Sequence, residues 1–350
     1  MVQFLQRLQA DLKEVENMAL IFSQNSGLND DLWKPVGQVI KSVMMDADTE
    51  KTPYDKLVTD LCNEEKSKKY AEKNTGLTST GTFQLVNEGD VPDLSDIRET
   101  FPKLIIHSTF MDEIACTRQM LDDGEINTMK TMSRNLVMGY KRTRAKLATN
   151  AVATEGAKYS MGSRELDKTT GDGKALFDTA HPAAKEGVAV QSNVFTNEFG
   201  NDSAMLIRLA NIGRNFKNNS GEVQGYTFDT IILPGNVPDL EDLVKRIIRS
   251  ELIPGSNNND VNTQKGLWNL IVLPTWQVAS GKKPYIIMSS EANKELRGTL
   301  FYDRVGLDVK NWVDEHSRNL LWNAYCRMSC GFNDWRHMIM GGADAGTTLS

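Results

Sequence analysis

The clearest helical pattern in the sequence is the stretch GEINTMKTMSRNLVMGYKRTRAKLATNAV, residues 124–152. Its apolar side chains recur at helical spacing and would share one side of a helix. They are Met129, Met132, Leu136, Tyr140, Leu147 and Ala151. Asp122 and Glu125 have the spacing of a capping box, which predicts where the helix begins. At roughly 1.5 Å per residue the helix would be about 42 Å long, long enough to form the spine of a domain.

The same helix carries basic side chains and no acid after Met129. The bases are Lys130, Arg134, Lys141, Arg142, Arg144 and Lys146. One interpretation is a DNA-binding helix, and the other is a side that meets acidic residues of a second subunit. The chain has 40 Lys and Arg against 46 Asp and Glu, a net charge of −6. This surplus of acids favours a contact between subunits over nucleic acid.

The segment before the spine begins with amphipathic helical patterns. Apolar residues from Met1 to Phe22 recur at alternating steps of four and three. A second helix is expected over Leu32–Met45 and a mixed-charge helix over Tyr54–Lys73. None of these helices could close a core by itself. Residues 1–78 are therefore predicted to form an extended N-terminal helical arm that packs on something else.

A β-rich region, residues 79–115, follows this arm. The runs Thr80–Val86 and Lys103–Phe110 contain residues that favour strands, and turn-forming residues fill 87–100 between them. A connection of about 16 residues is too long for a tight turn. The two runs are therefore predicted to form a long protruding β-hairpin.

Strands and helices alternate regularly after residue 226. A strand over Tyr226–Leu233 precedes a helix over Asp239–Ser250, whose apolar residues have the spacing of a core-facing side. The last long strand, Leu320–Gly331, alternates between residues for two different faces. Further elements are expected as a helix over Ser203–Phe216 and strands over Leu267–Leu273, Tyr285–Met288 and near Asp308–Trp312. Together these signals predict an α+β fold with a mixed α/β domain in the second half.

Length and composition exclude several classes of protein. A chain of 350 residues predicts about two domains. Its apolar runs are far shorter than the roughly 18–20 residues that a membrane span needs. Its four cysteines are too sparse for a disulfide framework. The first residues include acids where a signal peptide needs an apolar core, so we expect a reducing, cytoplasmic environment.

One short motif could carry metal or acid–base chemistry. Asp178 and His181 stand three residues apart in FDTAHP. They could be metal ligands or half of an acid–base pair, although a loop anchor fixed by hydrogen bonds is the favoured interpretation. No phosphate-binding loop and no nucleophile elbow is present in the sequence. We therefore expect no catalytic residue, no cofactor and no metal.

Two other motifs favour structural roles. Cys326 and Cys330 would lie about 13 Å apart on one face of a strand, too far to share a metal ion. Both would be buried as apolar residues. Asp334 and Arg336 flank Trp335 at the end of that strand. A carboxylate–guanidinium pair around an indole predicts a clasp that holds the turn.

Several stretches, taken in order, resemble the major capsid proteins of tailed phages, in particular the Mu-like major head subunit branch of the Hong Kong 97 fold. The stretches are LFDTAHP at 176–182, IRLANI at 207–212, FDTIILPG at 228–235, the Asn-rich turn at 258–262, LWNLIVLP at 267–274 and YCRMSCGFNDWR at 325–336. The resemblance covers roughly residues 80–342, and the first part of the chain matches nothing in the family.

The resemblance implies an anatomy for the chain. Residues 1–78 would be the N-terminal arm, and 79–115 the extended loop that reaches over a neighbouring subunit. The remaining parts would be a peripheral domain at 116–225 with its spine helix at 124–152, an axial domain at 226–324 and a return to the peripheral domain at 325–350.

The resemblance also implies a function, which is assembly. Copies of the chain would form hexamers and pentamers of an icosahedral head that encloses double-stranded DNA without sequence specificity. Partners would be the portal and, in some members, scaffolding or decoration proteins. The subunit would be found in the virion after assembly in the host cytoplasm, with no membrane involved. Some members form a covalent bond through a Lys in the extended loop, where this chain has Lys103, but no matching partner is visible.

Two alternatives stay open at this point. The same fold could form an encapsulin-like compartment that holds enzymes, and Asp178 with His181 could serve a metal-dependent hydrolase. The residues expected to act in structural or inter-subunit contacts are Lys103, Lys141, Arg142, Arg144, His181, Asp334, Trp335 and Arg336.

Overall fold

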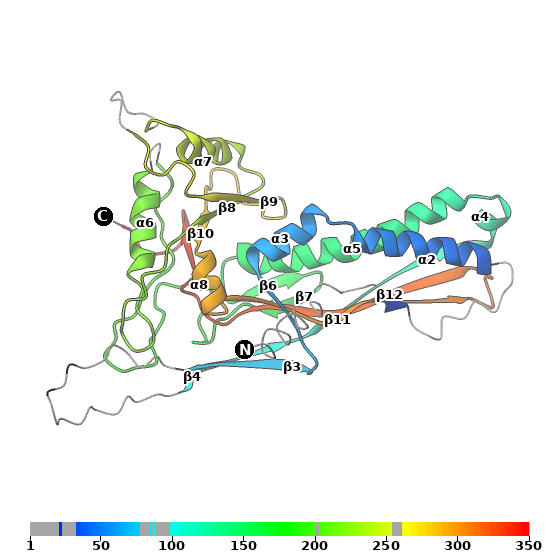
Figure 1. Cartoon of the computed structure of the whole chain (residues 1–350), viewed down its shortest axis with the longest axis horizontal. Coiled ribbons are helices and arrows are strands. Elements are labelled where there is room, and N and C mark those ends of the chain that lie inside the picture. Colours follow the sequence, from blue (N-terminus) through cyan, green and yellow to red (C-terminus); the bar gives the residue numbers. More distant parts are fainter. Residues whose placement is uncertain are drawn as a thin grey trace.

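The computed structural model describes residues 21–22, 33–77, 85, 87, 99–200, 203–253 and 261–349. Within these residues the chain forms two larger sheets, which lie in two different parts of the molecule, and two sheets of two strands each (Figure 1). One part extends along the helix α5, Ile126–Ala153, which is the predicted spine. The other part contains a smaller sheet with α6 and α7 beside it (Figure 1). None of the helices in the described residues is both long and apolar enough to cross a membrane.

The sheet beneath the spine is built on two long antiparallel strands, β11 (Thr299–Val313) and β12 (Leu320–Phe332). Its order is β1-β11-β12-β5, with β2 also paired to β11. The short outer strands are β1 (Ile21–Phe22), β2 (Asn63–Lys66) and β5 (Ser108–Cys116). Alternate residues of β12 are buried, as the sequence pattern predicted. Trp322 is among them and joins a core with Met129 and Leu136 of the spine.

The N-terminal helices pack on the spine of their own chain. Helix α2 (Lys34–Thr49) buries Ile40 and Met44 in the core that contains Met129 of α5. Helix α3 (Pro53–Leu61) begins with a capping box between Thr52 and Asp55. The predicted helix over Tyr54–Lys73 is wrong beyond Leu61, because the chain there forms strands. Tertiary pairing with distant strands overrides the helical pattern of these charged residues.

The predicted hairpin begins earlier in the chain than expected. Strand β3 (Ala71–Leu77) pairs antiparallel with β4 (Glu99–Ile106), and β5 follows β4 almost directly. The expected first strand, Thr80–Val86, lies outside the described residues except for Leu85. In Figure 1 the pair β3–β4 lies along one edge of the molecule and leads away from the spine.

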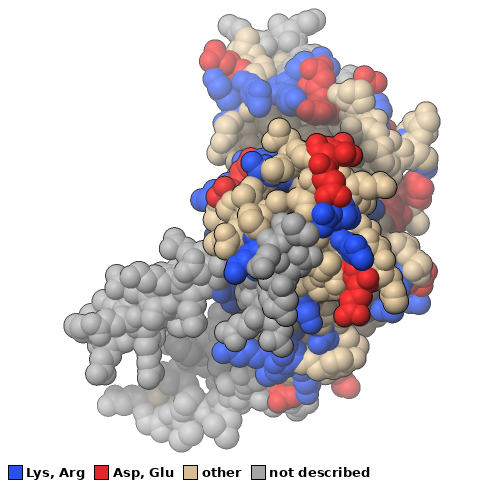
Figure 2. All heavy atoms as spheres, turned by 90° about the vertical axis from the view of Figure 1, so that its right-hand side faces the viewer, with Lys and Arg blue, Asp and Glu red and all other residues tan. Residues whose placement is uncertain are grey.

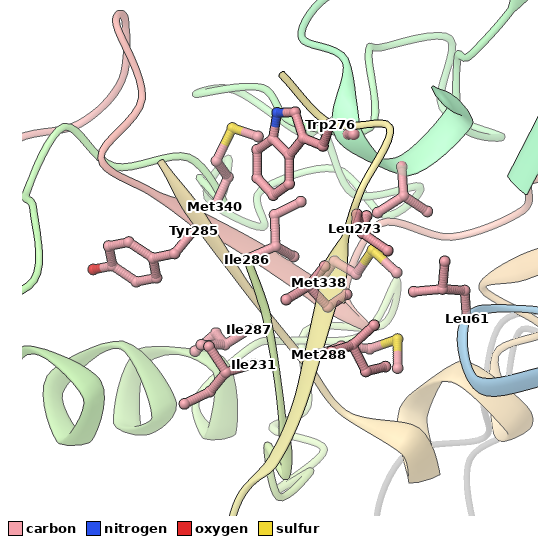
Figure 3. Packing of buried hydrophobic residues seen from close by; sticks show 14 of the residues in the cluster. Leu61, Ile231, Leu273, Trp276, Tyr285, Ile286, Ile287, Met288, Met338 and Met340 are labelled. Carbon is pink, nitrogen blue, oxygen red and sulfur yellow. The ribbon is translucent and has the colours of Figure 1, made fainter. Parts of the chain in front are cut away.

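The second sheet has the order β13-β10-β8-β9. Its strands are β8 (Thr230–Pro234), β9 (Asn269–Leu273), β10 (Tyr285–Met288) and β13 (Met338–Gly341). Three of these strands, β8, β10 and β13, are buried along their whole length, so both faces of the sheet are covered. Figure 3 shows Tyr285 and Ile287 on one side of β10 and Ile286 and Met288 on the other.

Three helices accompany this sheet. They are α6 (Ala204–Arg214), α7 (Pro238–Arg249) and α8 (Ser290–Glu295). Helix α7 buries Leu240, Val244, Ile247 and Ile248, the spacing expected from the sequence. These residues belong to a core that also contains Leu61 of α3 and Ala148 of the spine. One continuous core therefore joins the two parts of the molecule.

The remaining elements lie at the ends of the spine. Helix α4 (Arg118–Asp122) precedes it, and the hairpin β6–β7 (Lys158–Met161 and Arg164–Asp167) follows it. The predicted capping box is wrong, because Glu125 is the N-cap residue and its side chain makes no capping hydrogen bond.

The sheets also divide the chain differently from the anatomy that the resemblance implies. Strand β11 and all of β12 lie in the sheet beneath the spine, on both sides of the expected boundary at 324/325. Strand β13 belongs instead to the second sheet. The reason is pairing: β12 must stay beside β11 along its length, whereas β13 pairs with β10.

Candidate functional site

Lys141 fastens the N-terminal helices to the spine. Its ammonium donates hydrogen bonds to the backbone carbonyls of Asp48 at 2.8 Å and Glu50 at 2.5 Å. These carbonyls end helix α2, where a cation complements the exposed carbonyl groups. The same nitrogen lies 3.3 Å from the carboxylate of Asp55 in the capping box of α3. One buried lysine thus fixes the corner between two helices.

Arg144, one turn further along the spine, makes a second such contact. Its guanidinium donates to Glu64 of β2 at 2.6 Å and to Asp303 of β11 at 2.8 Å. Both Arg144 and Asp303 are buried. Burial raises the pKa of Asp303 to about 6, although the neighbouring Arg144 acts in the opposite direction. The pair connects three elements that are far apart in the sequence.

Basic side chains of the spine thus bind acceptors within the chain, whereas the sequence analysis favoured a contact with acids of a second subunit. Arg134 pairs with Glu50 of the same chain at 2.5 Å, and the contacts of Lys141 and Arg144 are also internal. The acids that we expected from a neighbouring subunit come from residues 48–64 and 303 of the chain itself. Arg142 and Lys146 are exposed and stay on the surface of the spine.

Lys103 lies on the inner face of the β3–β4 hairpin. It is buried, and its ammonium contacts the carboxylate of Asp167 and the hydroxyl of Thr169 at 2.7 Å. Burial raises the pKa of Asp167, but the hydrogen bonds from Lys103 and Thr169 outweigh it and lower the pKa below its usual value. Lys103 therefore anchors the hairpin on β7 of its own chain.

His181 is fully buried and bonds to Asp172, not to Asp178. Its Nδ1 lies 2.7 Å from Asp172 Oδ2, and its Nε2 lies 3.2 Å from Asn193 Oδ1. Burial raises the pKa of Asp172, but hydrogen bonds from His181 and Thr170 lower it below its usual value. The carboxylate of Asp178 instead accepts from the backbone of Ala180, so the alternative of an Asp178–His181 pair is not formed.

Trp335 stacks on His181 and completes this cluster. The two rings lie 4.3 Å apart and nearly parallel. The Arg336 guanidinium lies 4.8 Å from the indole and donates to Asp334 at 2.7 Å. Its remaining nitrogens donate to the Lys217 carbonyl and to Asn219 Oδ1. The Asp334 carboxylate and the Arg336 guanidinium therefore both have partners within the chain.

A further contact, which the sequence analysis missed, joins the hairpin to the sheet. His107 occupies the bend between β4 and β5 and is buried. Its ring nitrogens lie 2.9 Å from Ser329 Oγ and 3.0 Å from Ser67 Oγ. Burial and the nearby Arg327 lower its pKa. Ser67 and Ser329 are 262 residues apart in number, so no local pattern could have indicated their meeting at His107.

Side chains that could bind a metal or act as a thiol nucleophile are dispersed or buried in the described residues. Within the part of the chain that the structure describes, no three His, Cys, Asp or Glu side chains come together to hold a metal. All four cysteines, Cys62, Cys116, Cys326 and Cys330, are buried and unbridged. Burial raises the pKa of Cys326 to about 12, so its thiol stays protonated and unreactive at neutral pH.

The hairpin and the long sheet also expose apolar side chains and a strand edge on the surface. On the outer face of β4, Leu104 and Ile106 are 55% and 53% exposed. Strand β5 ends the sheet order, so one edge of it has no strand beside it among the described residues. Exposed apolar side chains and open strand edges are typical of surfaces that other chains cover.

Comparison with known proteins finds similarity in structure alone. No protein-family model matches the sequence, and no curated protein sequence matches it. The capsid of the native GTA particle superimposes with a TM-score of 0.53 at 8% identity, over 84% of this chain and 91% of that chain. A structure of Mycobacterium phage Patience gives 0.51 at 12% identity, over 95% and 94%. The chain has the Hong Kong 97 capsid fold.

The capsid of the empty GTA particle gives a similar result, with a TM-score of 0.50 at 10% identity over 83% of this chain and 90% of that chain. The similarity in fold therefore extends over most of each chain, although the sequences are only 8–12% identical. The contacts of Lys103, Lys141, Arg144 and His181 are therefore described from this chain alone.

Proposed function

We propose that the chain is the major capsid protein of a tailed phage. It self-assembles into hexamers and pentamers that form the icosahedral head around a double-stranded DNA genome. The observation that carries this proposal is the shared fold, which extends over 84% and 95% of the chain in the two structures with the highest TM-scores reported above. A match of this extent takes in most of the chain and most of each capsid protein.

The surface of the chain supports a role in assembly. A hairpin that carries Leu104 and Ile106 on its outer face exposes apolar area that a neighbour would cover. Many weak contacts per subunit act together in a closed shell, because each contact raises the effective concentration for the next. Lys103, Lys141, Arg144 and His181 each contact side chains or carbonyls of the same chain, which suits a role in holding the shape of a structural subunit.

Finer parts of the proposal rest on the sequence resemblance. These are the Mu-like branch, the portal with scaffolding or decoration proteins as partners, and a virion location after assembly in the host cytoplasm. The N-terminal arm, extended loop, peripheral domain and axial domain belong here too, with β11 and β12 assigned to the peripheral part because they pair beneath the spine. The proposed role of Lys103, Lys141, Arg144, His181 and the Asp334–Arg336 clasp is to hold the subunit's shape, with Arg142 on the surface.

Electron microscopy of the purified chain, together with light scattering, tests the proposal. We expect closed shells, or free hexamers and pentamers, when the chain is produced with the portal and scaffolding proteins of its phage. A chain that stays a monomer of about 39 kDa with those partners present would overturn the proposal. Shells that protect DNA from nuclease would separate a phage head from a compartment that encloses enzymes.

A further inference from the structure

Basic side chains gather around the turn between β2 and β3. Residues 66–73 contain four lysines and one acid, Glu72, which already bonds to Ser67 and Lys69. Arg304 donates from Nε to the Lys69 carbonyl, and the Arg327 guanidinium lies 5.9 Å from the Tyr70 ring. We call Lys68, Lys69, Lys73, Arg304 and Arg327 the basic patch. Figure 2 views the molecule from the α4 side, where groups of Lys and Arg lie beside groups of Asp and Glu.

This patch borders the apolar face of the hairpin. Lys73 pairs with Leu104 and Ala71 pairs with Ile106, so these residues share one face. Lys73 is exposed, as are Leu104 and Ile106. An apolar centre with a charged rim is the composition of a protein–protein interface. Phosphate backbones need only the charges, so the apolar centre favours a protein partner over DNA.

The opposite end of the sheet has the complementary composition. Here α4 and the turn after β11 lie together, since the backbone N–H of Arg118 donates to Asn319 Oδ1 at 3.0 Å. Residues 118–125 and 314–319 contain five acids and two arginines. We call the acids Asp122, Asp123, Glu125, Asp314 and Glu315 the acidic tip. Ile126 and Trp312, which are 40% and 37% exposed, supply apolar area beside it.

The two surfaces cannot meet within one copy of the chain. Strand β5 runs from Ser108, near the basic patch, to Cys116, near the acidic tip. Eight steps of roughly 3.4 Å separate the two ends by about 27 Å. A contact between two different surfaces of identical chains is heterologous, and such contacts build rings and closed assemblies.

We infer that the acidic tip of one subunit docks on the basic patch and the Leu104–Ile106 face of a second copy. The inference rests on the proposed function and names one contact that assembly uses. It also explains how copies of a chain with a net charge of −6 attract one another. The charges are separated on the surface, so that opposite signs face each other across the contact.

Charge reversal on each side, and on both sides together, tests this contact. Lys68→Glu with Lys73→Glu, or Asp123→Lys with Glu315→Lys, is expected to raise the protein concentration needed for assembly about tenfold. The variant with all four changes is expected to return to within about twofold of the unchanged chain. Light scattering and sedimentation measure assembly, and thermal unfolding checks the fold. Lys174→Glu with Lys185→Glu, two exposed lysines elsewhere, is the matched control.

Three results would overturn the inference. The first is normal assembly of either two-residue variant, and the second is a four-residue variant no better than its parents. The third is a basic-patch variant that assembles normally but loses binding to double-stranded DNA, which would assign the patch to the genome. If the unchanged chain with its phage partners forms neither shells nor capsomers, the proposed function itself fails.

Discussion

Buried ions at single positions hold this subunit together. Lys141 and Arg144 project from the spine into contacts with the N-terminal segment, and each satisfies several acceptors at once. A buried charge is tolerated only when it is paired and hydrogen-bonded. Removing one partner therefore costs more than the pair itself contributes, since the other charge stays buried.

Arg144→Ala is expected to lower the free energy of unfolding by about 3–5 kcal/mol, because it leaves Asp303 buried without its partner. Arg142→Ala is the matched control two residues away, and its exposed side chain predicts a change within about 0.5 kcal/mol. Urea denaturation of the two variants measures the difference. Equal stability of the variants would show that the ion pair between Arg144 and Asp303 is not needed.

Lys168 gives the chain a pH dependence that one substitution should remove. Its side chain is fully buried, with Nζ 3.3 Å from the Val152 carbonyl and 5.2 Å from the Phe177 ring. Burial lowers its pKa to about 7. Above that pH the folded chain releases a proton that the unfolded chain keeps until about pH 10.4. The free energy of unfolding therefore rises with pH by about 1.4 kcal/mol per unit in this window, and the lysine adds no slope below it.

Lys168→Met should lose this contribution to the slope. Denaturant unfolding at pH 7.5 and pH 9 measures it as the difference between the substituted and unchanged chains, with Lys174→Met as the exposed control. The Lys168→Met chain should gain less stability between the two pH values than the unchanged chain. An identical gain in both chains would contradict the assignment of the slope to Lys168.

At the scale of helices and strands, the local sequence pattern was sufficient where it shows directly which faces of an element are buried. The helix expected over Asp239–Ser250 is α7, Pro238–Arg249, and the strand expected over Leu320–Gly331 is β12, Leu320–Phe332. In both elements, apolar residues recur at the spacing of the buried face, so the sequence itself shows which side chains face the core. Tyr285–Met288 matches β10 in full, because its unbroken apolar run is buried on both faces.

Local pattern failed where the partner is distant. Residues 63–66 form a strand because they pair with Leu300–Asp303, more than 230 positions away. The internal partners of Arg144 and His181 were missed for the same reason, since Asp303 and Asn193 carry no local signal. Asp172 stands in a Gly-Asp-Gly turn, and only that turn could have drawn attention to it. Charge patterns alone could not distinguish an internal acid from one on a neighbouring subunit.

Alanine substitutions at two helical glycines are expected to change the stability in opposite directions. A methyl group at Gly139 of the spine would meet nothing within 4 Å, whereas one at Gly213 of α6 would lie 2.1 Å from the Phe228 ring. Gly139→Ala is expected to stabilise the chain by about 0.5–1 kcal/mol through helix propensity. Gly213→Ala is expected to destabilise it by about 1–3 kcal/mol through overpacking. Melting temperatures that shift in the same direction for both variants would contradict this packing.

The whole molecule is joined by a core that passes between its two parts. Val58 and Leu61 of α3 belong to the same buried cluster as Leu233 and Met288 of the second sheet. Figure 3 shows Leu61 pointing from its helix toward Met288. The N-terminal segment is thus part of the interior of the subunit between residues 33 and 66. The two parts are therefore expected to unfold together.

Leu61→Ala tests this cooperativity. The side chain is fully buried, so the substitution is expected to cost about 2–5 kcal/mol, and exposed Thr59→Ala next to it should cost little. Hydrogen exchange distinguishes local from global destabilisation. Amides that exchange only by global unfolding all lose protection equal to the full decrease in the free energy of unfolding. We expect amides of α2 and of β8 to lose the same amount of protection. If α2 loses protection while β8 keeps it, the N-terminal helices are a separate unit that can detach and the continuous core does not couple the two parts.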